Sequence, residues 1–123
     1  MIRPAPNFSL LSMLLAISLF VNSCTSEEKP PEHTISKEKM ALILTDIHVA
    51  ESRVTKLQLK SLDSSLMIFN KLKADIWKKH KVDTLNYRNS YSYYMSHPKQ
   101  MSEIYEKVNK DIELREKTNS IKL

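Results

Sequence analysis

The chain has 123 residues, with 19 basic and 14 acidic side chains and a formal charge of +5. It contains no glycine, although glycine makes up about 7% of average sequences. Phosphate-cradling loops and dinucleotide fingerprints need glycines, so both are excluded. Disulfide frameworks and thiolate zinc sites are also excluded, because the chain has a single cysteine.

An apolar segment, residues 8–21, is interrupted only by serines and follows one basic residue. It is shorter than the roughly 20 apolar residues that span a membrane, but it has the length of a signal-peptide core. The segment ends in Val21-Asn22-Ser23-Cys24, which resembles the bacterial lipobox, although asparagine is not the commonest residue at its position. The resemblance implies that residues 1–23 are cleaved and that acyl chains on Cys24 hold the protein in membrane lipid.

Residues 25–34 contain prolines and charged side chains but no large apolar residue, so residues 24–35 are predicted to form a flexible tether. Thr25 differs from the aspartate that retains some lipoproteins in the inner membrane. We therefore expect the outer membrane, on its periplasmic face or at the cell surface. The Glu27-Glu28 pair resembles a short surface-export signal, but a soluble linker explains it slightly better. An exported protein rarely meets nucleic acid, so no nucleic-acid partner is expected.

Residues 36–118 are predicted to form an all-α domain, a small bundle of three to four amphipathic helices, because apolar residues recur at helical spacing and never alternate. The first helix starts after Ser36 and reaches about Lys56. The second helix starts at Ser61-Leu62-Asp63 and ends near His80. The third starts at Asp83 or Thr84 and stops before Pro98, which disfavours helix in the residue before it. The fourth runs from Pro98 to about Lys117, and residues 119–123 are a frayed tail.

Each helix has an apolar stripe that we expect in the core, and a core this small leaves room for a partner protein to complete it. In chain order the stripes are Met40, Ile43, Leu44, Ile47 and Val54; Leu66, Phe69, Ile76 and Trp77; Tyr87, Tyr91, Tyr94 and Met95; and Met101, Ile104, Tyr105, Val108 and Ile112.

The domain resembles an uncharacterised family of short bacterial lipoproteins with one all-helical domain of unknown function. The resemblance covers about residues 35–112. It rests on Lys39-Met40, Asp46-Ile47-His48, Ala50-Glu51, residues 69–82, Tyr87 with Ser90, Tyr93-Tyr94, Pro98 and Ile104-Tyr105. Lys81 stands where that family often has glycine or asparagine. The resemblance implies no reaction, substrate or cofactor.

Glu51 interrupts the apolar stripe of the first helix, about 20° from Met40 around the helix axis. A buried carboxylate must be hydrogen-bonded, paired or protonated. We expect a structural bond from Glu51 to a tyrosine, a histidine or Arg115 of another helix, and the alternative is a ligand-contacting or acid–base group. One carboxylate without partner groups is not a catalytic set.

His48 and Glu51 are three residues apart, a spacing that metal sites in helical bundles use on two helices at once. No second such pair accompanies them, so His48 is interpreted as a surface histidine and no metal is expected. Tyr93 points away from the apolar face of the third helix, and with Trp77 it is the candidate for an exposed stacking contact. Core packing explains the other tyrosines better.

These observations predict a membrane-anchored lipoprotein that acts as a binding or scaffold subunit in the cell envelope, with an envelope protein as partner. Neither catalysis nor a cofactor is expected. The alternative is a small-molecule or glycan-binding lipoprotein that uses Tyr93, Trp77 and Glu51. A tyrosine-lined pocket around Glu51 would favour that alternative, and an exposed apolar strip would favour the subunit.

Overall fold

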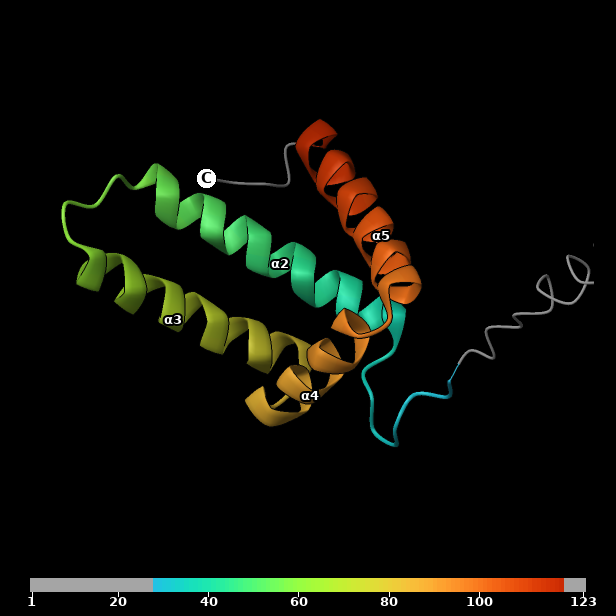
Figure 1. The fold of residues 1–123 in the computed structure, drawn as a ribbon. Coiled ribbons are helices and arrows are strands. Elements are labelled where there is room, and N and C mark those ends of the chain that lie inside the picture. The colour runs from blue at the N-terminus through green and yellow to red at the C-terminus, as the bar shows by residue number, and fades with distance from the viewer. Residues whose placement is uncertain (1–27, 119–123) are drawn as a thin grey trace, which may run out of the picture.

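The computed structural model describes residues 28–118, which form four α-helices and no strand (Figure 1). The helices are α2 (Lys37–Lys56), α3 (Leu62–His80), α4 (Thr84–Met95) and α5 (Pro98–Lys117). These bounds agree with the prediction, and the all-α fold is confirmed. The expected signal peptide, Cys24 and the tail 119–123 lie outside the described residues, so those expectations stay predictions.

The helices begin where local cap signals place them. Ser36 Oγ accepts a hydrogen bond from the Lys39 N–H at 3.3 Å, and Asp83 Oδ1 accepts one from the Asn86 N–H at 2.8 Å. Each cap satisfies a backbone donor that has no partner inside the first helical turn. α5 instead begins with Pro98, whose missing N–H is not needed at that position.

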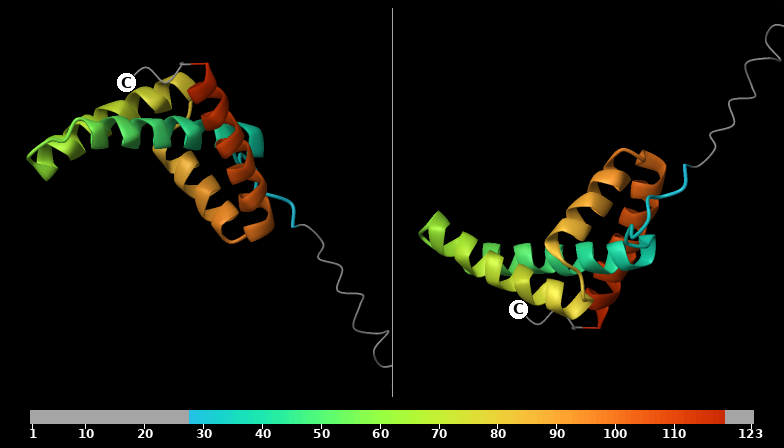
Figure 2. Two further views of the ribbon diagram at one scale, coloured as in Figure 1. Left: turned by 90° about the horizontal axis from the view of Figure 1, so that it is seen from above. Right: turned by 90° about the horizontal axis from the view of Figure 1, so that it is seen from below.

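Two helical hairpins, α2–α3 and α4–α5, cross one another (Figures 1 and 2). α2 packs against both α3 and α5, and α4 packs against α5. The first half of α2 is therefore covered from two sides, and every residue from 40 to 47 except Leu42 is buried. The centre of the core is formed by Ile43, Ile104 and Val108, which are at most 1% exposed.

The far end of the α2–α3 hairpin projects beyond the crossing, as Figure 2 shows. We call residues 52–68 the arm: they comprise the last turns of α2, the connecting loop and the first turns of α3. No residue between 51 and 75 is buried. Leu66, which was expected in the core, is 48% exposed, because α5 does not reach the arm. Met95, the last residue of α4, is likewise exposed instead of buried. Among residues 28–118 no helix is long and apolar enough to cross a bilayer.

Ile35, expected at the end of the tether, belongs to the core and is 5% exposed. Its N–H donates to Ser90 Oγ at 2.9 Å, and its carbonyl accepts from the Tyr94 hydroxyl at 2.6 Å. These bonds attach the start of the domain to α4, so the packed structure begins one residue before Ser36.

The turn between α3 and α4 contains Lys81 in the left-handed conformation, with φ of 51°. Glycine and asparagine adopt this conformation most easily, while a side chain such as lysine costs about 1 kcal/mol. A left-handed turn explains why glycine or asparagine would suit this position.

Candidate functional site

Asp46 is the only charged residue among the buried residues of the 28–118 region, and 9% of its side chain is exposed. It lies in the half of α2 that α3 and α5 cover. A buried carboxylate needs hydrogen bonds or cations around it, and the packing of three helices supplies both.

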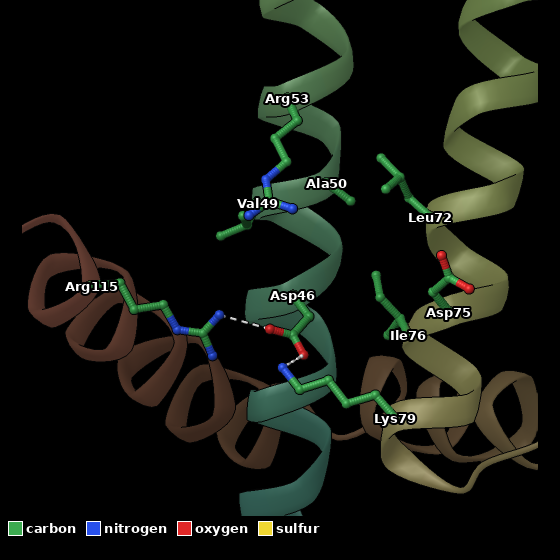
Figure 3. A pocket seen from close by; sticks show the side chains of 9 residues that line it. All are labelled: Asp46, Val49, Ala50, Arg53, Leu72, Asp75, Ile76, Lys79 and Arg115. Carbon is green, nitrogen blue, oxygen red and sulfur yellow. Dashed lines mark hydrogen bonds and ion pairs between the residues drawn. The ribbon is translucent and has the colours of Figure 1, made fainter. Parts of the chain in front are cut away.

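Basic side chains from the last turns of α3 and α5 converge on Asp46, and two of them, Lys79 and Arg115, appear in Figure 3. Arg115 Nη1 donates to Asp46 Oδ1 at 2.7 Å, and Lys79 Nζ donates to Oδ2 at 2.8 Å. His80 Nε2 lies 2.6 Å from the same Oδ2. Cations are also favourable at helix C-termini because of the helix dipole. We call these four residues the Asp46 cluster.

The Asp46 cluster sets the ionisation of its carboxylate. Burial alone would raise the pKa of Asp46, but the bonds from Lys79, Arg115 and His80 outweigh burial and lower the pKa to about 2. Asp46 is therefore ionised at any physiological pH. An efficient general base has a pKa near the operating pH, so this carboxylate suits a structural ion cluster better than proton transfer.

A cleft of about 360 Å³ opens beside the Asp46 cluster, between α2 and α3 (Figure 3). Apolar and charged side chains line it together: Val49, Ala50, Leu72 and Ile76, with Asp46, Arg53, Asp75, Lys79 and Arg115. Its volume falls at the small end of the range for ligand-binding clefts. Helical periodicity does not predict this cleft, because its lining comes from helices whose packing the local pattern does not fix.

A second group of side chains, which we call the aromatic cluster, consists of Trp77, Tyr87, Tyr91, Tyr105 and His48. The ring centroids of Trp77 and Tyr87 are 4.7 Å apart, and those of Tyr87 and Tyr91 are 5.8 Å apart. His48 lies 6.1 Å from Tyr105. Burial, followed by the nearby Tyr91, Tyr105 and Glu51, raises the pKa of Tyr87 to about 12. Two of the four predicted binding residues, Trp77 and His48, thus belong to this cluster. A third, Glu51, lies beside it through its bond to His48.

The prediction that Glu51 is buried against another helix is wrong. Its side chain is 52% exposed, and its Oε2 lies 3.1 Å from Nδ1 of His48 on the same helix. Arg115, one of its expected partners, bonds to Asp46 instead. Helical periodicity correctly gives the face of Glu51, but α5 crosses α2 before that position and leaves it uncovered.

Tyr93 does not join the aromatic cluster. Its hydroxyl donates to the Glu28 carbonyl at 2.8 Å, and its ring stacks on His97 with centroids 4.1 Å apart. Gln100 Nε2 donates to the same hydroxyl at 3.4 Å. Tyr93 is therefore half-buried and holds the end of the tether, where an exposed contact was expected.

A metal site was not expected, and within residues 28–118 no group of three or more His, Cys, Asp or Glu side chains is arranged to hold an ion. His48 and Glu51, noted for their spacing, bond to each other, with Nδ1 and Oε2 at 3.1 Å. His80, interpreted as a helix-end histidine, lies at the end of α3, where it is committed to Asp46.

The fold and site define a small all-α domain whose central helix is held through one buried carboxylate by cations of two neighbouring helices. Residues 31–118 match the family described as a domain of unknown function, DUF4296. The match covers most of the chain, so the chain belongs to this family. No curated protein and no solved structure matches it. The expectation of an uncharacterised helical family is confirmed, and its lipoprotein character is a proposal.

Proposed function

We propose that this protein is a lipoprotein of the cell envelope, anchored in the outer membrane through Cys24, that acts without catalysis as a binding or scaffold subunit for an envelope protein. The lipobox-like ending of the apolar segment at residues 8–21 supports the anchor. The tether and the helical domain then follow in the order that such an anchor requires.

The exposed arm is the observation that carries the binding role. Leu57, Leu62, Leu66 and Met67 of the arm are 54%, 74%, 48% and 69% exposed. Exposed apolar side chains gathered in one region are typical of interaction sites, whereas isolated ones need no explanation. The arm also carries three basic residues and only one acidic residue, Asp63, so a partner with an acidic rim fits it.

The position of the tether favours a protein partner over the anchoring membrane. The tether enters α2 at the end opposite the arm (Figure 1), and a helix of 20 residues is about 30 Å long. The Glu28 carbonyl is bonded to Tyr93 of α4, and the four residues from Cys24 to Glu28 can reach at most about 14 Å. A lipid anchor at Cys24 would therefore hold the opposite end of α2 near the bilayer, with the arm farther from it and accessible to other envelope components.

The double substitution Leu62→Glu/Met67→Glu is expected to abolish complex formation without unfolding the domain. Both side chains are exposed, so the melting temperature should stay close to wild type. Two carboxylates in an apolar interface would lack partners, and burying them is costly. The measurement is formaldehyde crosslinking of intact cells, followed by blotting for complexes that contain the protein.

Ser102→Glu/Asn109→Glu is the matched control, because it adds the same charge at two exposed positions of α5. This control should keep the complex. Equal amounts of complex in the arm variant and the control would contradict the docking role. A lipid-binding arm would give a different result. Cys24→Ser would then remain on membranes, and adding the arm substitutions would release it while the complex stayed intact.

The aromatic cluster favours a second candidate function, binding of a glycan or another small molecule. Trp77 is the only tryptophan of the chain, so its fluorescence reports directly on this cluster. Titration with N-acetylglucosamine oligosaccharides should quench or shift its emission saturably. Glu51→Gln should weaken binding about tenfold by removing a charged acceptor, whereas Glu113→Gln on α5 should not. Unchanged emission would rule out this candidate for such glycans.

A further inference from the structure

We propose that the cleft beside the Asp46 cluster is a binding site for a small organic anion, a carboxylate attached to a short apolar group, and that Arg53 holds its charge. Arg53 is the one residue that this site shares with the arm, and none of the exposed apolar side chains that carry the docking proposal lines the cleft, so the proposal does not depend on the docking function.

Arg53 is the side chain that points to this ligand. It lines the cleft, and in Figure 3 its guanidinium lies over Val49, on the side of the helix that carries Asp46. Arg53 is an exposed residue, and within residues 28–118 no hydrogen bond or ion pair engages its guanidinium. A guanidinium presents five N–H donors in a fork that matches a carboxylate. Its donors are therefore available to a bound anion.

The lining of the cleft carries one more cation than carboxylates. Three cations, Arg53, Lys79 and Arg115, line it against two carboxylates, Asp46 and Asp75. Both oxygens of Asp46 are already occupied by Lys79, His80 and Arg115. Lys79 has three N–H donors, and a bond to Asp46 uses one of them. An anion near Arg53 is therefore attracted by the remaining donors and opposed mainly by Asp75.

The apolar part of the lining selects the rest of the ligand. Val49, Leu72 and Ile76 border the cleft from α2 and α3, and Val49 and Leu72 are only partly buried. A short hydrocarbon group gains about 0.8 kcal/mol for each CH₂ that leaves water. The Asp46 cluster joins α2, α3 and α5 before any ligand binds, so the walls of the cleft are already in place and the Arg53 side chain is the group that binding must order.

The test is an NMR titration of the full chain in a non-ionic detergent with three probes: hexanoate, its uncharged analogue hexanamide, and inorganic phosphate. Hexanoate should give saturable amide shifts confined to the residues around the cleft. It should bind about tenfold more tightly than hexanamide, since a charge-assisted bond is strong. It should also bind more tightly than phosphate, which has no apolar group.

Three variants complete the experiment. Arg53→Gln should weaken hexanoate binding about tenfold and leave hexanamide unaffected. Arg88→Gln, the same change at an exposed residue of α4, should leave both unaffected. Asp75→Asn should tighten hexanoate binding, because it removes the opposing charge. Equal binding of hexanoate and hexanamide, an unaltered Arg53→Gln titration, weaker binding by Asp75→Asn, or no saturable shift would each overturn the proposal.

Discussion

Asp46→Ala is expected to lower the free energy of unfolding by about 2–3 kcal/mol at neutral pH. The substitution removes the hydrogen-bond partner of His80, whose side chain is 10% exposed, and one of two carboxylates from Arg115, whose side chain is 24% exposed and which keeps Asp111 at 2.9 Å. Buried polar groups that lose a partner keep the cost of desolvation without the bond that offset it. Lys79 is 62% exposed and can return to water, so it adds little. Urea denaturation followed by circular dichroism measures the loss.

Glu38→Ala is the matched control, because Glu38 also accepts a bond from a lysine, Lys107, at 2.7 Å, but its side chain is 67% exposed. Exposed ion pairs contribute little, so its denaturation midpoint should stay close to wild type. An Asp46→Ala variant as stable as Glu38→Ala would show that the Asp46 cluster does not hold the three helices together.

The lowered pKa of Asp46 also predicts how acid acts on the fold. Its pKa falls from the ordinary 3.8 to about 2, so its stabilisation is complete above pH 4 and is lost as the pH falls toward 2. The lost stability is at most about 2 kcal/mol, and solvent around Lys79 reduces it further. Asp46→Ala should lack this part of the acid dependence, which denaturation midpoints measured between pH 5 and pH 2 would reveal.

Cys24→Ser is expected to abolish lipid labelling and release the protein from membranes. The hydroxyl of serine cannot replace the thiol that the proposed lipobox would present for acylation. Each acyl CH₂ in the bilayer contributes about 0.8 kcal/mol, so loss of the chains removes the anchor entirely. Metabolic labelling with a clickable fatty acid, followed by membrane fractionation, measures both effects.

Thr25→Ser provides the control for this experiment, since it changes the neighbouring residue and leaves the thiol in place. It should be labelled like wild type. A Cys24→Ser protein that carries as much label as wild type would refute the anchor at this residue.

Local patterns were sufficient to predict the helices. Ser36, Asp83 and Pro98 each mark a helix start by chemistry that acts within one turn, and all three are found at helix starts. The central stripe residues, such as Ile43 and Ile104, are buried as expected because they lie where the two hairpins cross.

The errors at Glu51 and Leu66 have one physical cause, which is that periodicity gives the face of a helix but not the length over which a neighbour covers it. Glu51 and Leu66 lie on the predicted faces, yet both are exposed because α5 crosses α2 nearer its start. Asp46 shows the opposite effect. It lies off the main apolar stripe and is buried because α2 is covered from two sides.

The sequence nevertheless carries a signal for the Asp46 cluster. The last turns of α3 and α5 contain several basic residues, including Lys79, His80 and Arg115. If both ends pack on the same helix, they need an acidic partner there, and Asp46 lies in the first helix. The cleft with Arg53 has no comparable signal, because its walls are brought together only by the angle between α2 and α3.

Site-specific photocrosslinking in living cells tests most directly whether the arm docks onto an envelope protein. A photoreactive amino acid at Met67 of the arm is compared with one at Asn109, an exposed residue of α5. We expect one discrete protein adduct from position 67, absent from position 109 and lost when Leu62→Glu is added. An adduct formed equally from both positions, or from position 109 alone, would contradict docking through the arm.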